Sequence, residues 1–176
     1  MPVSLAKART NPKGSLDRAQ FLRGNWRGVA DTIRPPWALE DDHFLKTCTL
    51  CRDCVSACPE SILRLDNQGY PEVDFKRGEC TFCGDCAQAC KPLALRAQGQ
   101  QPWSYHAQIN NRCLAVQGVM CRSCGDSCDT RAIRFQLAVG GFSTPEIDLE
   151  NCTGCGACIA PCPAGSIEIT RNSKEN

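Results

Sequence analysis

Cysteine is the residue type most able to do chemistry in this sequence, since it fills 16 of the 176 positions. A share of about 9% is near the level at which cysteine chemistry helps to hold a small domain together. The cysteines form four groups of four, and none is left over. The groups are Cys48, Cys51, Cys54 and Cys58; Cys80, Cys83, Cys86 and Cys90; Cys113, Cys121, Cys124 and Cys128; and Cys152, Cys155, Cys158 and Cys162.

Three of the four groups have the spacing C-x2-C-x2-C-x3-C, and two of these continue into proline, at Pro59 and Pro163. This pattern is typical of bacterial [4Fe–4S] sites, where one short loop brings three thiolates to a cluster and the fourth cysteine ligates the cluster of a partner motif. Small residues between the cysteines expose backbone N–H groups to the cluster sulfurs. The glycines in these places are Gly84, Gly125, Gly154 and Gly156.

The distance along the chain pairs the first motif with the second and the third with the fourth. The first and second motifs start 32 residues apart, at Cys48 and Cys80. In the third motif the regular spacing puts the first ligand at position 118, a glycine, which lies 34 residues before the start of the fourth motif at Cys152. Cross-ligation within each pair then predicts four clusters, all bound through iron. The predicted ligands are Cys48, Cys51, Cys54 and Cys90 for cluster 1; Cys80, Cys83, Cys86 and Cys58 for cluster 2; Cys113, Cys121, Cys124 and Cys162 for cluster 3; and Cys152, Cys155, Cys158 and Cys128 for cluster 4.

The third motif departs from the regular spacing. Gly118 stands where the first cysteine belongs, and the nearest candidate, Cys113, lies five residues upstream. A longer loop can still deliver this thiolate. The sequence leaves open whether cluster 3 is labile, loses an iron to become [3Fe–4S], or uses another ligand.

Disulfides and zinc are the competing interpretations of the cysteines. Disulfides suit secreted proteins, but the sequence shows no signal peptide and the C-x2-C-x2-C rhythm is not that of bridged pairs. Zinc favours two separated C-x2-C pairs around one tetrahedral ion. Iron–sulfur clusters therefore fit best, and they imply a reducing, cytoplasmic location.

The elements around the cysteines predict an α+β fold of two tandem bacterial 2[4Fe–4S] ferredoxin-like modules with a short N-terminal helical arm. Hairpins are predicted at 62–65 with 71–75 and at 132–137 with 146–149, and a short strand at 166–169. Short helices follow the cysteine loops. The predicted divisions are the arm, 1–44; the first two-cluster module, 45–97; a polar linker, 98–112; the second module, 113–170; and a disordered tail, 171–176.

The arm carries an amphipathic helix signal. Ala19, Leu22, Trp26, Val29 and Ile33 recur at steps of three and four and form one apolar stripe. This stripe either packs on the protein's own modules or docks a partner. Its arginines are expected to be solvated; they are Arg18, Arg23, Arg27 and Arg34.

Charge and composition exclude several classes of protein. Residues 1–34 carry a formal charge of +5, whereas the remainder carries −4 and becomes more acidic with clusters bound, so a nucleic-acid-binding surface is not expected. No stretch approaches the roughly 20 apolar residues of a membrane span. His43 and His106 are the only histidines and have no positioned carboxylate, so no catalytic site is expected.

The order of these features resembles the NapF family, the ferredoxin-type accessory proteins of the periplasmic nitrate reductase system. The resemblance covers roughly residues 16–170 and rests on Ile33-Arg34-Pro35-Pro36-Trp37, the two regular motifs, the stretched motif from Cys113 to Cys128, and the last Cys-Pro motif. It implies a cytoplasmic iron–sulfur protein that contacts the molybdenum-containing catalytic subunit of nitrate reductase before export.

Two functional hypotheses follow. As the resemblance implies, the chain assists maturation of that catalytic subunit by donating electrons or iron–sulfur components. Alternatively, it is a general electron-transfer polyferredoxin that connects a donor to an oxidoreductase. In both cases the clusters also hold the fold, because the free energy of metal binding becomes folding free energy in such domains.

Overall fold

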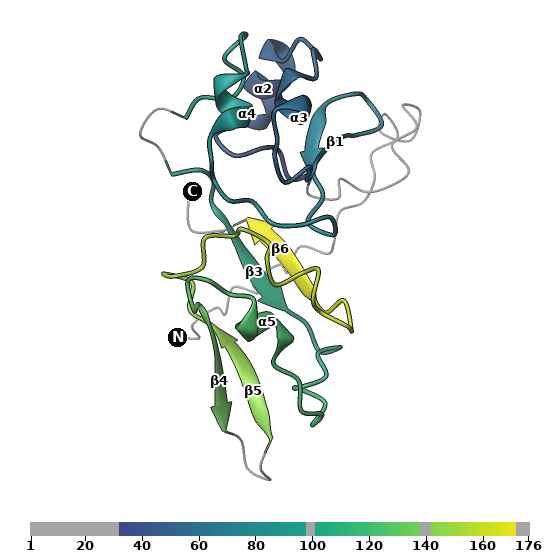
Figure 1. The fold of residues 1–176 in the computed structure, drawn as a ribbon, viewed down its shortest axis with the longest axis vertical. Coiled ribbons are helices and arrows are strands. Elements are labelled where there is room, and N and C mark those ends of the chain that lie inside the picture. The colour runs from purple at the N-terminus through teal and green to yellow at the C-terminus, as the bar shows by residue number, and fades with distance from the viewer. Residues whose placement is uncertain (1–31, 98–100, 138–141, 172–176) are drawn as a thin grey trace, which may run out of the picture. The chain divides into compact units, whose positions relative to one another are not determined.

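The computed structural model describes residues 32–97, 101–137 and 142–171 (Figure 1). The segment from Ile33 to Asn176 forms one compact unit. The amphipathic helix expected over 19–33 lies almost wholly outside the described residues, as do residues 172–176 of the expected tail. No helix in the described ranges is long and apolar enough to cross a membrane.

The first half of this unit contains three helices and one hairpin. They are α2 (Asp41–Thr47), α3 (Asp53–Ser56), β1 (Leu63–Leu65), β2 (Pro71–Val73) and α4 (Asp85–Gln88). β1 and β2 are antiparallel, with Leu63 opposite Val73, as the hairpin pattern predicts. The turn between them includes Gly69, whose φ of +87° favours glycine.

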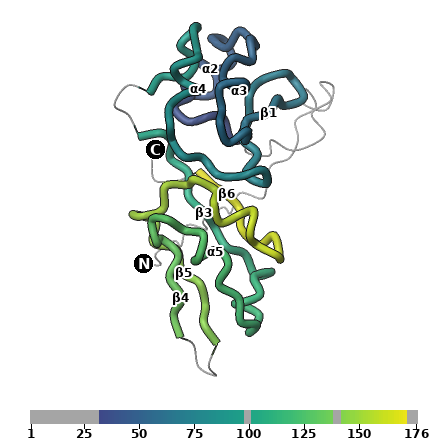
Figure 2. The backbone as a smooth tube through the Cα atoms, in the orientation of Figure 1, coloured from purple at the N-terminus to yellow at the C-terminus, as the bar shows by residue number. Residues whose placement is uncertain are grey.

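The described residues of the second half contain one helix and four strands in two sheets. They are β3 (Tyr105–Ile109), α5 (Ser123–Asp126), β4 (Ile133–Leu137), β5 (Ser143–Ile147) and β6 (Ile167–Arg171). β4 pairs with β5 as the second predicted hairpin, and β6 pairs with β3, both antiparallel. Figure 2 shows that much of the described backbone runs as loops between these short elements.

Two of the sequence predictions need correction here. The linker expected at 98–112 includes β3, whose alternation of buried Tyr105 and Ala107 with polar neighbours is a strand signal within a polar stretch. Arg171, the first residue of the tail expected at 171–176, closes β6 opposite Tyr105, and the rest of that tail lies outside the described residues. The strand β6 therefore completes its sheet with this segment rather than with the neighbouring hairpin.

The buried side chains form two clusters, and each contains cysteines. The first gathers around Phe44 and Ile62 and includes Cys54, Cys86 and Cys90. The second gathers around Ile167 and Ile169 and includes Cys124 and Cys158. Phe75 belongs to the second cluster although it follows β2 of the first half, so this side chain connects the two modules.

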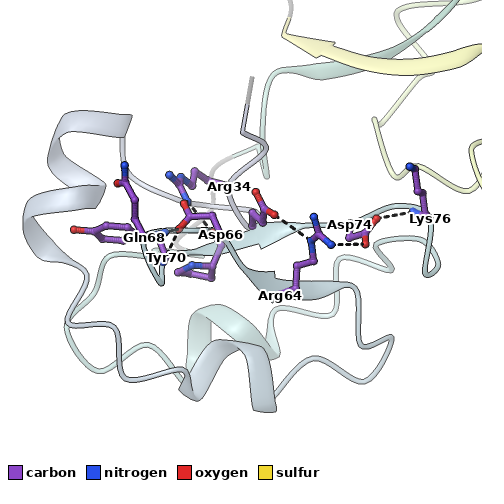
Figure 3. Close-up of polar contacts among 9 residues, drawn as sticks. Arg34, Arg64, Asp66, Gln68, Tyr70, Asp74 and Lys76 are labelled. Carbon is purple, nitrogen blue, oxygen red and sulfur yellow. Dashed lines mark hydrogen bonds and ion pairs between the residues drawn. The ribbon is translucent and has the colours of Figure 1, made fainter. Parts of the chain in front are cut away.

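The segment before α2 is attached to the first hairpin by an ion pair (Figure 3). Arg34 lies 2.8 Å from Asp66 with both side chains mostly buried, and its guanidinium also lies over the rings of Phe44 and Tyr70. Burial by itself raises the pKa of Asp66, but hydrogen bonds from Arg34 and from two backbone N–H groups outweigh it and lower the pKa. Arg34 is thus a structural residue, and the expectation that it is solvated was wrong.

Candidate functional site

The three regular cysteine loops share one backbone conformation. Two and four residues after the first cysteine the backbone is left-handed, at Leu50 and Arg52, at Phe82 and Gly84, and at Gly154 and Gly156, with φ between +53° and +87°. This alternation turns successive N–H groups toward one side of the loop, where they can face negatively charged sulfur. Left-handed backbone costs free energy at non-glycine residues and is typical of functional sites. Three of these six left-handed residues are glycines, so the glycine positions in the sequence predict only part of the pattern.

The loop of the third motif has a different backbone conformation. Arg122, at the equivalent of the second left-handed position, has a φ of −134°. The inserted residues fold into a compact turn in which the N–H of Gln117 donates to the carbonyl of Cys113 (3.0 Å) and that of Val119 to Leu114 (2.9 Å). Cys113 is buried. The inserted residues thus form a hydrogen-bonded turn of their own between Cys113 and Cys121.

All four motifs end in the same turn. The residue three positions after the fourth cysteine has a φ of +53° to +61° and donates its N–H to the carbonyl of that cysteine over 2.9–3.2 Å. These residues are Ser61, Leu93, Arg131 and Gly165. The next residue is buried in every case, with 1% of its surface exposed. These four buried residues are Ile62, Ala94, Ala132 and Ser166.

The structure brings together the thiols predicted to bind cluster 1, here called set 1. Cys48, Cys51, Cys54 and Cys90 line one apolar hollow together with Phe44. Burial, with the neighbouring thiols of Cys90, Cys48 and Cys51, raises the pKa of Cys54 to about 11. Cys54 is the second residue of the one-turn helix α3, and Cys90 comes from the partner motif.

Set 2, the thiols predicted for cluster 2, is built in the same way. Cys58, Cys80, Cys83 and Cys86 line a second apolar hollow. Burial raises the pKa of Cys86 to about 12, with further contributions from Cys80 and Cys54. Cys86 occupies in α4 the place that Cys54 occupies in α3.

Set 3 includes the irregular motif. Cys113, Cys121, Cys124 and Cys162 line a third hollow, which also contains apolar side chains such as that of Phe135. Burial raises the pKa of Cys124 to about 11, and the neighbouring Cys113 makes the second largest contribution. The structure therefore brings Cys113 into this set in place of Gly118.

Set 4 comprises Cys152, Cys155, Cys158 and Cys128. Burial raises the pKa of Cys158 to about 12, and the neighbouring Cys155 and Cys152 add to this rise. Burial also raises the pKa of Cys155, with a smaller contribution from Cys128. The backbone N–H of Ala107 in β3 donates to Sγ of Cys152 over 3.4 Å, and no sequence pattern predicts this contact.

Electrostatic effects and one hydrogen bond link the four sets in the order 1, 2, 4, 3. Cys54 of set 1 helps to raise the pKa of Cys86 in set 2, and Cys124 of set 3 helps to raise the pKa of Cys158 in set 4. Between the modules, the N–H of Cys80 in set 2 donates to the carbonyl oxygen of Cys155 in set 4 over 2.8 Å. The irregular motif therefore contributes to one end of the row.

The chemistry of these residues fits [4Fe–4S] clusters. All sixteen cysteines are free thiols, which argues against disulfides. Within 32–97, 101–137 and 142–171, no three His, Cys, Asp or Glu side chains are grouped so as to hold one metal ion. The thiols of sets 1, 2 and 3 line apolar hollows, and such hollows beside the cysteine loops suit an iron–sulfur cluster.

Hydroxyl groups also lie close to some cysteine sulfurs. In the described residues these contacts all belong to the second module: Ser123 to Cys121 (3.9 Å), Thr130 to Cys128 (3.6 Å) and Ser166 to Cys162 (3.3 Å). Burial acts to raise the pKa of Cys162, but hydrogen bonds from Ser166 and from the backbone N–H groups of Ala164 and Gly165 together outweigh it and lower the pKa. His43 is exposed, and His106 contacts Thr170.

Comparison with known proteins agrees with this geometry. The 4Fe-4S dicluster domain family matches residues 47–93 and 119–166. The chain is 42% identical to the ferredoxin-type protein NapF of Haemophilus influenzae over 165 residues, which covers 88% of this chain and 94% of that protein. It is 43% identical to NapF of Escherichia coli K12 over 155 residues, with the same coverage. The methylamine utilization ferredoxin-type protein MauM of Methylorubrum extorquens is 31% identical over 85% of this chain and 76% of its own length.

The fold, the four thiol sets and the two domain matches define a ferredoxin-type iron–sulfur protein with tandem 4Fe–4S dicluster modules. The identity and coverage of the first two relatives extend this conclusion. The chain belongs to the NapF family.

Proposed function

We propose that this chain is a cytoplasmic iron–sulfur accessory protein that assists maturation of the molybdenum-containing catalytic subunit of periplasmic nitrate reductase before export. It binds four [4Fe–4S] clusters through its sixteen cysteines, with the ligand sets given above. When bound, the clusters supply one-electron transfer at low potential. The chain acts as a donor of electrons or iron–sulfur components and has no substrate site.

The observation that carries this proposal is the row of thiol sets, together with membership of the NapF family. Loops and the one-turn helices α3, α4 and α5 hold sets 1, 2 and 3 around their hollows. The hydrogen bond from Cys80 to Cys155 fixes the two modules to each other between sets 2 and 4. Such a chain can donate electrons or iron–sulfur components to a partner without a substrate site.

The test compares nitrate-grown cells that contain the wild-type chain, no chain, or the Cys152→Ser variant. The proposal predicts that the last two export the nitrate reductase catalytic subunit in an inactive form. Asn151→Ala is the matched control, because Asn151 is the exposed neighbour of Cys152. Fully active nitrate reductase in cells that lack the chain would contradict the proposal.

The partner is tested by anaerobic purification of the tagged chain, followed by identification of the bound proteins. Recovery of the unexported catalytic subunit supports maturation, and its loss on deletion of residues 1–34 would assign docking to the arm. Recovery of a reductase or a membrane redox subunit, with no molybdoenzyme, would support the electron-transfer polyferredoxin instead. The hydrogen bond between the loops of sets 2 and 4, with the electrostatic effects between sets 1 and 2 and between sets 4 and 3, is the observation that favours this second function.

A further inference from the structure

A buried hydroxyl lies against one of the cysteine sulfurs. Ser166 is the one buried polar residue of the described ranges, with 1% of its surface exposed. Its Oγ lies 3.3 Å from Sγ of Cys162, and its backbone N–H donates to the same sulfur over 3.4 Å. β6 begins with the next residue, so the position of Ser166 is fixed by a strand (Figure 1).

The internal repeats show that the fold does not require a hydroxyl at this position. The equivalent residues, four positions after the fourth cysteine, are Ile62, Ala94 and Ala132, and each is as buried as Ser166. The preceding turn is the same in all four motifs. Aliphatic side chains therefore satisfy the packing at this position in the other three repeats, and the serine serves another purpose.

The direction of this hydrogen bond follows from the chemistry of the ligand. A cysteine bound to iron is a thiolate and has no hydrogen to donate, so the hydroxyl of Ser166 must be the donor. Donation to sulfur stabilises negative charge on the ligand. It therefore favours the reduced, more negative state of an iron–sulfur cluster over the oxidised state.

We propose that Ser166 is a positioning residue that raises the reduction potential of the cluster bound by set 3. This inference rests on the proposed assignment of Cys162 to that cluster. Reduction adds one electron, which the chemical reductant supplies. No covalent bond breaks, and the hydroxyl proton stays on Ser166 and donates to a more negative sulfur.

Charged side chains near set 3 are less suited to this task. Arg112 and Arg122 are exposed, and water and salt screen their charges. The hydroxyl of Ser166, in contrast, is buried and contacts a single ligand, Cys162. The hydroxyls of Thr130 and Ser123 lie farther from their sulfurs, at 3.6 Å and 3.9 Å, so among the described residues Ser166 makes the shortest hydroxyl contact to a ligand of set 3.

The experiment uses the full chain, purified anaerobically with its clusters, and a redox titration followed by electron paramagnetic resonance. Ser166→Val and Ser166→Thr have the same shape and differ only by the hydroxyl. The repeat that contains Ile62 accommodates a β-branched residue at this position. We expect Ser166→Val to move one signal to a more negative potential, while Ser166→Thr stays near the wild-type value and the other signals do not move.

A gain-of-function variant provides the reciprocal test. Ala132→Ser places a hydroxyl four residues after Cys128, in the same turn, and should move a different signal to a more positive potential. Equal potentials for Ser166→Val and Ser166→Thr, or a common shift of all signals, would overturn the inference.

Cys162→Ser separates this inference from the proposed function. Loss of the same signal that Ser166→Val shifts would support both the ligand assignment and the role of Ser166. If Cys162→Ser removes a signal that Ser166→Val leaves in place, the ligand assignment stands and the role of Ser166 fails. If Cys162→Ser removes no signal, the ligand assignment itself is wrong, and the inference falls with it.

Discussion

The backbone N–H of Cys80 donates to the carbonyl oxygen of Cys155 over 2.8 Å, so a ligand loop of the first module is hydrogen-bonded to a ligand loop of the second. Phe75 lies at the same junction, against Gly156 and edge-on to the ring of Trp103. Trp103 in turn donates its Nε1–H to the carbonyl of Thr153 over 2.9 Å. The two modules are therefore held together at their cysteine loops.

Gly156 at this junction should tolerate no side chain. A Cβ at Gly156 would overlap the ring of Phe75, and the φ of +83° adds strain. Gly69→Ala is a matched control, because Gly69 has a φ of +87° with open space around it. Overpacking costs about 1–3 kcal/mol, so we expect Gly156→Ala to lower the thermal midpoint by roughly 5 °C more than the control does. Equal thermal midpoints for the two variants would mean that Phe75 can move away from a Cβ at position 156 without loss of stability.

The ion pair between Arg34 and Asp66 should stabilise the first module in a pH-dependent way. Arg34→Ala leaves the mostly buried Asp66 carboxylate without its cation and should cost about 2 kcal/mol at pH 7. The pKa of Asp66 is lowered in the fold. Its contribution is therefore complete above the unfolded value of about 3.9 and is lost as the pH falls through the lower folded value.

A double-mutant cycle measures this coupling. Arg34→Ala, Asp66→Asn and the double variant are compared by chemical unfolding at pH 7 and at successively lower pH. The interaction free energy should shrink toward zero in acid. A coupling that stays constant, or that grows as the pH falls, would contradict the assignment of the pair. Arg64→Ala is the control, since the Arg64 side chain is half exposed and its ion pair with Glu72 should contribute little.

The sequence predicted which thiols line common hollows in sets 1, 2 and 3, because cysteine spacing reflects cluster geometry. The cluster ligands themselves stay a prediction. The two hairpins were also predictable, since each has alternating residues around a turn. β3 was not, because its five residues lie within a polar stretch and pair with a strand about 60 residues later. The left-handed backbone at Leu50, Arg52 and Phe82 has no compositional signal, since these are not glycines. The contact between Ser166 and Cys162 was likewise not predicted from the sequence. It arises from a turn that all four motifs share.

Cross-ligation between motifs makes a prediction about iron content. Cys54 and Cys90 belong to one set, so Cys54→Ser with Cys90→Ser should remove one cluster, about a quarter of the iron. Cys54→Ser with Cys58→Ser affects sets 1 and 2 and should remove about half of the iron. Iron and sulfide analysis of anaerobically purified protein gives the comparison, with Cys54→Ser alone as the baseline. A larger loss in the variant of Cys54 and Cys90 would mean that each motif binds its own cluster.

Removal of iron should unfold the described unit. Cysteines make up much of the buried side-chain set, including Cys54, Cys86, Cys124 and Cys158, and burial raises the pKa of each. Without iron these thiols bind protons and line empty hollows, and few aliphatic residues remain to stabilise the fold. Because metal binding supplies folding free energy in such domains, oxidation with a chelator should abolish the cluster absorbance and the near-ultraviolet circular dichroism together. The control is the chelator alone under reducing, anaerobic conditions, which should leave both signals intact. Retention of the tertiary signal after complete loss of iron would show that the polypeptide packs without its clusters.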